Sequence, residues 1–115
     1  MGKIFSLKKV ELFKKLLREG RKYRDSLFKL YILPQEEKKV MLGVSLPRKI
    51  KGSVVRNKIK RRLKEIVRKT TDGIENGYSI LIIPEEKIKE ASFQDISSKI
   101  EKIFRSLKWK NFLSF

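Results

Sequence analysis

The sequence contains neither cysteine nor histidine among its 115 residues. Without cysteine the chain cannot form disulfide bonds or use a cysteine nucleophile. Without histidine it cannot build a catalytic triad with a histidine base, and without either residue it cannot build a zinc site of the Cys/His kind. Carboxylates and lysines are the groups that remain for acid–base or nucleophilic chemistry. We therefore do not expect this chain to catalyse a reaction on its own.

Acidic residues are also scarce. There are 13 Asp and Glu residues against 30 Lys and Arg residues, which gives a net charge of +17 at pH 7. A small soluble domain needs a net charge of only about 2 to 8. Because so large an excess repels itself until anions approach, the composition predicts a polyanionic partner, and nucleic acid is the first candidate.

Long hydrophobic runs are missing as well. No stretch of about 18 apolar residues occurs, and the first twenty residues carry charges throughout, unlike a signal peptide. We expect a cytoplasmic protein. The length fits one domain, here residues 1–115, and the 40% of hydrophobic residues suffices for a core.

Hydrophobic periodicity predicts three helices and three strands. The predicted helices are Ser6–Glu19, Val54–Lys69 and Phe93–Leu107, and the predicted strands are Ser26–Leu33, Val40–Leu46 and Tyr78–Ile83. The short link at residues 35–39 favours an antiparallel hairpin between the first two strands. This order of elements indicates an α+β protein whose helices cover a sheet.

Small and polar residues mark the predicted helix ends. Ser6 is a candidate N-cap of the first helix, and Gly20 stands where a glycine commonly ends one. Ser92 precedes the last helix, with Asp95 three residues on as an acidic analogue of a capping box.

Positive charge is concentrated between Arg48 and Lys69, where eleven basic residues accompany a single acid, Glu65. Four of them follow one another at i, i+4 spacing on the middle helix: Arg56, Lys60, Lys64 and Arg68. An ordinary solvated helix mixes Glu with Lys, because like charges at this spacing destabilise it by a few tenths of a kcal/mol per pair. The row therefore predicts a phosphate-binding face. Asn57 fits either a hydrogen bond to nucleic acid or a plain polar position in the first helical turn.

The segment Val54–Glu65 closely resembles the arginine–asparagine signature of the bacterial ribonuclease P protein family, which has the form RNxxKRxx(R/K)E. Matching residues elsewhere extend the resemblance from about Lys8 to Leu107: Phe13, Gly20, Phe28, Tyr31, Gly43–Ser45, Arg48, Lys49, Ile83 and Pro84.

The resemblance implies a fold. Members of the family form a single-domain two-layer α+β sandwich of the order α-β-β-β-α-β-α, with a mixed sheet and a left-handed βαβ crossover, similar to the second domain of a small-subunit ribosomal protein. This order has one strand more than the periodicity predicts, and we expect that short strand near Leu46–Lys51.

The resemblance also implies a function. In this family the protein is the non-catalytic subunit of an endoribonuclease, and the large RNA subunit with bound Mg²⁺ removes the 5′ leader of precursor tRNA. We therefore expect an RNA-binding domain with no catalytic or metal-ligating residues of its own, whose partners are ribonuclease P RNA, in a 1:1 complex, and precursor tRNA.

Two sets of site residues follow from the resemblance. The set expected to face the catalytic RNA is Arg48, Lys49, Arg56, Asn57, Lys60, Arg61, Lys64 and Arg68. The set expected to line a cleft for the single-stranded leader is Phe13, Leu17, Lys29 and Tyr31. By spacing alone Phe13 also fits the core, whereas Tyr31 shares a strand face with Lys29, as in a solvated groove. Leu17 stands where some relatives have a second aromatic residue, so stacking is expected to be weaker here.

Other classes of protein share some of these features. Another basic RNA-binding or ribosomal protein would have the same charge, although nothing about it requires the Arg56–Asn57 signature. A DNA-reading helix would need to be free of the sheet, and a metal-dependent nuclease would need clustered carboxylates, whereas Glu36–Glu37 and Glu85–Glu86 are adjacent residues in loops. Binding to a membrane surface would need a wider apolar face on the first helix.

Overall fold

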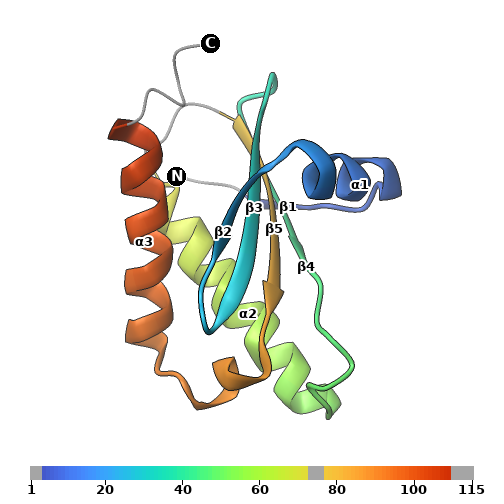
Figure 1. Cartoon of the computed structure of the whole chain (residues 1–115), viewed down its shortest axis with the longest axis vertical. Coiled ribbons are helices and arrows are strands. Elements are labelled where there is room, and N and C mark those ends of the chain that lie inside the picture. The colour runs from blue at the N-terminus through green and yellow to red at the C-terminus, as the bar shows by residue number, and fades with distance from the viewer. Residues whose placement is uncertain (1–3, 73–76, 110–115) are drawn as a thin grey trace.

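The computed structural model describes residues 4–72 and 77–109 (Figure 1). It contains five strands, three α-helices and one short 3₁₀ helix. In chain order they are β1 (Ile4–Ser6), α1 (Val10–Glu19), β2 (Arg21–Arg24), β3 (Phe28–Gln35), β4 (Val40–Val44), α2 (Ser53–Thr70), β5 (Gly77–Pro84), η1 (Glu86–Glu90) and α3 (Phe93–Trp109). The predicted α+β class is confirmed, and each predicted helix and strand has a counterpart.

The strands form one mixed sheet in the order β1-β4-β5-β3-β2. β5 is its central strand: it pairs antiparallel with β3 along eight residues and parallel with β4 along five. Because β4 and β5 are parallel neighbours, the chain between them crosses over through α2, and these elements form the βαβ unit that the resemblance implies.

The predicted hairpin between the first two long strands is wrong, because β5 lies between β3 and β4. Residues 36–39 cross two strand spacings of about 4.8 Å, which four residues can span. Hydrogen bonds from Gln35 Nε2 and from the Tyr78 amide to the Lys39 carbonyl, 2.9 and 3.1 Å long, hold this link over the start of β5. At Gly77 a Cβ would overlap the Glu37 carbonyl oxygen, so the crossing needs a glycine there.

The additional short strand is also not where we predicted it. Residues 46–51 form a turn, and the additional strands are β1 and β2 at the two edges of the sheet. Ser6 therefore belongs to β1 and is not a helix N-cap, since α1 begins only at Val10. Gly20 does end α1, but with a φ of −67° rather than in the left-handed region.

At the start of α3 the predicted cap is present. The Asp95 amide donates to Ser92 Oγ at 3.1 Å, which satisfies one of the free N–H groups of the first turn.

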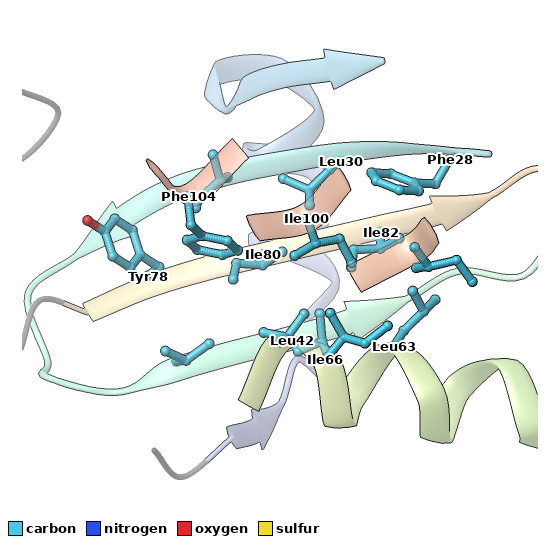
Figure 2. Close-up of a cluster of buried hydrophobic side chains, with 14 of the residues drawn as sticks. Phe28, Leu30, Leu42, Leu63, Ile66, Tyr78, Ile80, Ile82, Ile100 and Phe104 are labelled. Atoms are coloured by element: carbon cyan, nitrogen blue, oxygen red, sulfur yellow. The ribbon is translucent and has the colours of Figure 1, made fainter. Parts of the chain in front are cut away.

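The alternating side chains of the strands build a core on each face of the sheet. Phe28, Leu30, Ile80 and Ile82 point toward α2 and α3 and form the larger core, which Figure 2 shows in close-up. Tyr31 and Leu81 point the other way and pack against Leu16 of α1. Figure 1 accordingly shows α1 and α3 on opposite sides of the sheet. Two helices thus cover one face, and the short α1 covers part of the other.

Candidate RNA-binding site

Helix α2 carries the densest positive charge, and its apolar side fixes how it lies. Ile59, Leu63, Ile66 and Val67 are buried in the larger core. Packing of this side against the sheet turns the remaining surface of the helix to solvent, as the periodicity predicted. The basic side chains of the signature are therefore displayed on the outer and flanking sides of an anchored helix.

The central cations of this helix are exposed to solvent. Lys60, Arg61 and Lys64 are solvent-exposed, and within residues 4–72 and 77–109 none of them forms an ion pair. Asn57 lies beside them, also exposed. Unpaired like charges on one side of a helix raise its energy until anions bind, so these residues are positioned to contact phosphates.

The two ends of the basic row differ from its centre. Arg68 forms a two-point contact with Glu65, from Nε to Oε2 at 3.2 Å and from Nη2 to Oε1 at 2.6 Å. The hydrogen bond from Arg68 lowers the pKa of Glu65. The guanidinium of Arg68 is therefore partly neutralised, and the row of four free cations expected from the sequence is reduced at this end.

At the other end, Arg56 turns back toward the loop that precedes the helix. Its Nη1 donates to the carbonyl oxygens of Ile50 at 2.7 Å and Pro47 at 3.1 Å, and its Nη2 donates to the Leu46 carbonyl at 3.4 Å. Arg48 and Lys49 lie exposed between these carbonyls. The predicted residues 48, 49 and 56 are thus brought together, but Arg56 faces the backbone with most of its donors.

A hollow of about 250 Å³ connects α2 with the N-terminal part of the chain. Lys60 and Lys64 form its cationic side, while Phe13 of α1 and Phe5 of β1 contribute aromatic rings. The remaining lining residues are Ile4, Ser6, Leu7, Leu42, Gly43 and Val44. Gly43 keeps this space open, because a Cβ there would lie 3.0 Å from the ring of Phe13 and from a methyl group of Leu7. An apolar and aromatic surface beside two exposed lysines suits a nucleotide, whose base is flat and whose phosphate is charged.

The predicted leader cleft is only partly assembled. Phe13 is half-buried and Leu17 is exposed on α1, while Lys29 and Tyr31 share one face of β3. Tyr31 is only 9% exposed, because Leu16 and Leu81 pack against it, and Lys22 Nζ lies 5.6 Å from its ring centroid. Phe13 is thus better placed than Tyr31 to meet a base.

Sequence reasoning missed the contribution of β1. Phe5 is 43% exposed at the hollow, and Lys39 Nζ lies 5.1 Å from its ring centroid. With only three residues, β1 is too short for a strand period to stand out, so no pattern marked it.

The described residues contain no group of acidic side chains that could hold a metal ion. Several of the acidic side chains instead pair with nearby cations, as Glu37 does with Lys39, Glu65 with Arg68 and Asp25 with Lys99. The helices of the same residues also lack a segment with the length and hydrophobicity that spanning a membrane requires.

The fold and the site together define a class: a small α+β protein that displays an anchored basic helix beside an aromatic hollow, as RNA-binding proteins do. Comparison with known proteins then gives the family. The model of the ribonuclease P family matches residues 1–108. The chain belongs to that family, which confirms the resemblance found in the signature.

Relatives of known name agree with this assignment. The ribonuclease P protein component of Dictyoglomus turgidum is 38% identical over 101 residues, which cover 85% of this chain and 84% of the relative. That of Caldanaerobacter subterraneus is 32% identical over 103 residues, with 90% and 89% covered.

Solved structures show the same fold. The ribonuclease P protein of Staphylococcus aureus superposes with a TM-score of 0.77 at 25% identity, covering 92% of this chain and 97% of that one. The protein from Thermotoga maritima gives a TM-score of 0.70 at 26% identity, with 79% and 86% covered.

Proposed function

We propose that the chain binds the catalytic RNA of ribonuclease P, one protein per RNA, and helps that RNA to remove the 5′ leader of precursor tRNA. The observation that carries the proposal is the outer side of α2, where Lys60, Arg61 and Lys64 are exposed and form no ion pair with the acidic residues that the structure describes, while the opposite side is anchored in the core. Such an arrangement places phosphate-binding charges at fixed positions, which free lysines on a flexible loop would not do.

The turn at Arg48 and Lys49 extends this surface beyond the end of the helix. Both side chains are exposed, and they precede the first turn of α2, where backbone N–H groups lack helical partners. Both features favour anionic ligands. We therefore assign the catalytic RNA to a surface formed by Arg48, Lys49, Asn57, Lys60, Arg61 and Lys64.

The leader is assigned to the hollow beside this surface. Lys60 and Lys64 line the hollow from α2, and Phe13 lines it from the opposite side. A single-stranded leader that leaves the surface for the catalytic RNA therefore passes these two lysines as it reaches an aromatic ring. Stacking on an aromatic ring accepts any base, which a leader of variable sequence requires. Tyr31 and Lys29 continue this side of the sheet, where Tyr31 acts mainly as a packed support.

The chemical step is assigned to the RNA subunit. The sequence has no histidine or cysteine, and its described part has no carboxylate cluster, so Mg²⁺ is proposed to be held by RNA phosphates. The protein then contributes by offsetting phosphate repulsion between the two RNAs and by holding the leader. Another RNA-binding or ribosomal role is the alternative, and the family assignment favours the first.

The decisive experiment is cleavage of a precursor tRNA by a bacterial ribonuclease P RNA at low Mg²⁺, with and without the protein. The proposal expects cleavage that depends on both components, and the variant Lys87→Ala, which removes one exposed charge from the 3₁₀ helix η1, should support cleavage equally well. No gain over a wide range of protein concentrations and RNA partners would overturn the proposal in favour of the alternative.

A further inference from the structure

The backbone between β4 and α2 makes a tight turn whose tip carries two cations. The Ile50 amide donates to the Pro47 carbonyl at 3.1 Å, so Arg48 and Lys49 occupy the two central positions of a β-turn. Ile50 is fully buried and anchors the far side of this turn in the core, while Arg48 and Lys49 are exposed.

Arg56 joins both ends of this turn. Its Nη1 donates to Pro47 O and Ile50 O, the carbonyls of the first and last residues of the turn, and its Nη2 reaches Leu46 O. The side chain itself is only partly exposed. A guanidinium has five N–H donors in a rigid planar fork. Arg56 makes three hydrogen bonds to backbone carbonyls, so most of its donors are already used within the protein.

This geometry is specific to arginine. A lysine ammonium at the end of a flexible chain could reach one carbonyl, but it does not present the planar fork that bridges three of them. The turn also needs such a bridge, because Arg48 and Lys49 repel each other at its tip, and the chain after it passes through Gly52 at a φ of +95°, which adds no rigidity of its own.

We infer that Arg56 is a positioning residue: it acts on RNA mainly by fixing the turn that presents Arg48 and Lys49, and only secondarily through its own charge. This inference rests on the proposed RNA-binding function. It separates the first arginine of the signature, which shapes the surface, from Lys60, Arg61 and Lys64, which contact phosphates directly.

The test compares lysine and alanine at two positions of α2. If Arg56 were a direct phosphate contact, Arg56→Lys would keep most of the affinity for ribonuclease P RNA. A positioning role instead makes Arg56→Lys as weak as Arg56→Ala, to within about twofold, the usual error of additivity. Arg61 is the matched control: it is exposed and pairs with no acidic residue in the described part of the chain, so Arg61→Lys should bind clearly better than Arg61→Ala.

A double-mutant cycle adds a readout that loss of stability alone would not move. Once the turn has lost its bridge, removing Arg48 and Lys49 should cost little more, so the loss in the combined Arg48→Ala, Lys49→Ala, Arg56→Lys variant should fall well below the product of the separate losses. Independent, multiplying losses would overturn the inference, as would full affinity in Arg56→Lys.

Hydrogen–deuterium exchange on the free protein distinguishes failure of this inference from failure of the proposed function. Exchange of the Ile50 amide and its neighbours in residues 46–51 should speed up at least about fivefold in Arg56→Lys, with the core strands β3 and β5 unchanged. Unchanged exchange in residues 46–51 would overturn the positioning role even if RNA binds. If exchange is faster in Arg56→Lys but the wild-type protein binds no ribonuclease P RNA, the structural role of Arg56 in the turn stands. The role of Arg56 in RNA binding is then refuted together with the proposed function. Circular dichroism confirms that each variant is folded.

Discussion

The Asp25 carboxylate accepts a hydrogen bond from Lys99 Nζ at 2.8 Å and so ties the turn between β2 and β3 to helix α3. The same carboxylate also accepts the Leu27 amide at 3.0 Å. A single aspartate therefore stabilises the turn and fastens it to a helix that begins nearly seventy residues later in the chain.

This contact predicts a pH-dependent part of the stability. Burial raises the pKa of Asp25, but the bonds from Lys99, Leu27 and Ser26 together lower it below its ordinary value of 3.8. The folded state thus binds this proton less readily than the unfolded state, so the stabilisation is complete above the unfolded pKa and is lost as the pH falls through the lower folded value.

The variant Asp25→Asn should lower the free energy of unfolding at pH 7 by about 1 kcal/mol, since both partners are partly exposed and solvent screens the pair. Urea unfolding measured at pH 7 and below pH 3 checks it, and the difference from wild type should shrink at the lower pH. Glu101→Gln removes a fully surface pair with Arg105 and should change neither curve. A deficit for Asp25→Asn that persists at low pH would contradict this account.

Substitution of the free lysines on α2 should weaken RNA binding through charge alone. Lys60→Ala and Lys64→Ala should each reduce the slope of log K against log salt by about 0.7 to 0.9, the contribution of one phosphate contact. Lys87→Ala removes the same charge from η1 and should leave the slope unchanged. Filter binding or fluorescence titration between about 50 and 200 mM salt measures it. Equal losses for all three variants would mean that net charge matters and position does not.

Phe13 should distinguish precursor from mature tRNA. Phe13→Leu keeps an apolar group against Gly43 but removes the aromatic face, so affinity for precursor tRNA in the holoenzyme should fall by about 1 kcal/mol, roughly fivefold. Affinity for mature tRNA, which has no leader, should stay the same. Leu17→Ala on the exposed side of α1 is the control and should have a smaller effect on the precursor. If Phe13→Leu lowered the affinity for precursor and mature tRNA equally, the assignment of the leader to the hollow would be wrong.

Tyr31 should behave as a core residue in stability measurements. Tyr31→Ala removes a ring packed between Leu16 and Leu81 and should lower the free energy of unfolding by about 3 kcal/mol. Tyr31→Phe keeps the ring and should leave binding of precursor tRNA close to wild type. Selective loss of precursor affinity in Tyr31→Phe would show instead that the hydroxyl contacts the leader.

Gly77 should be intolerant of any side chain. Because a Cβ would overlap the Glu37 carbonyl, Gly77→Ala should destabilise the fold by more than about 2 kcal/mol. Gly43→Ala is the matched variant on the neighbouring strand: its Cβ would lie 3.0 to 3.2 Å from side-chain atoms of Leu7 and Phe13 and would overlap no backbone atom, so its effect should be smaller. Thermal denaturation of both variants gives the comparison, and similar melting temperatures would contradict the crossing of residues 36–39 over β5.

The long elements could be predicted from the sequence because each carries a clear hydrophobic period. The apolar spacing of residues 55–67 fixed both the helix and its basic outer side. The edge strands could not be predicted, since Arg21–Arg24 holds three cations in four residues and forms a strand only because it pairs with β3. Link length alone could not reveal that β5 separates β3 from β4, because a short link fits both arrangements.

The signature could be recognised in the sequence, but the contacts that each of its residues makes could not be predicted. Spacing placed Arg56 and Arg68 in the same row as Lys60 and Lys64. It could not show that Arg56 reaches the carbonyls of its own loop or that Arg68 meets Glu65, because long side chains have many rotamers and local partners decide among them.

The position of β5 between β3 and β4 also sets the order in which the molecule can be built. During synthesis β3, β4 and α2 all leave the ribosome before β5, so the larger core cannot close until the chain as far as Pro84 has emerged. The basic signature therefore exists as an unanchored cationic segment before the sheet closes around its last strand. Closure of the sheet depends on contacts between segments far apart in the sequence, which slows folding and lengthens the time for which the basic segment is unanchored.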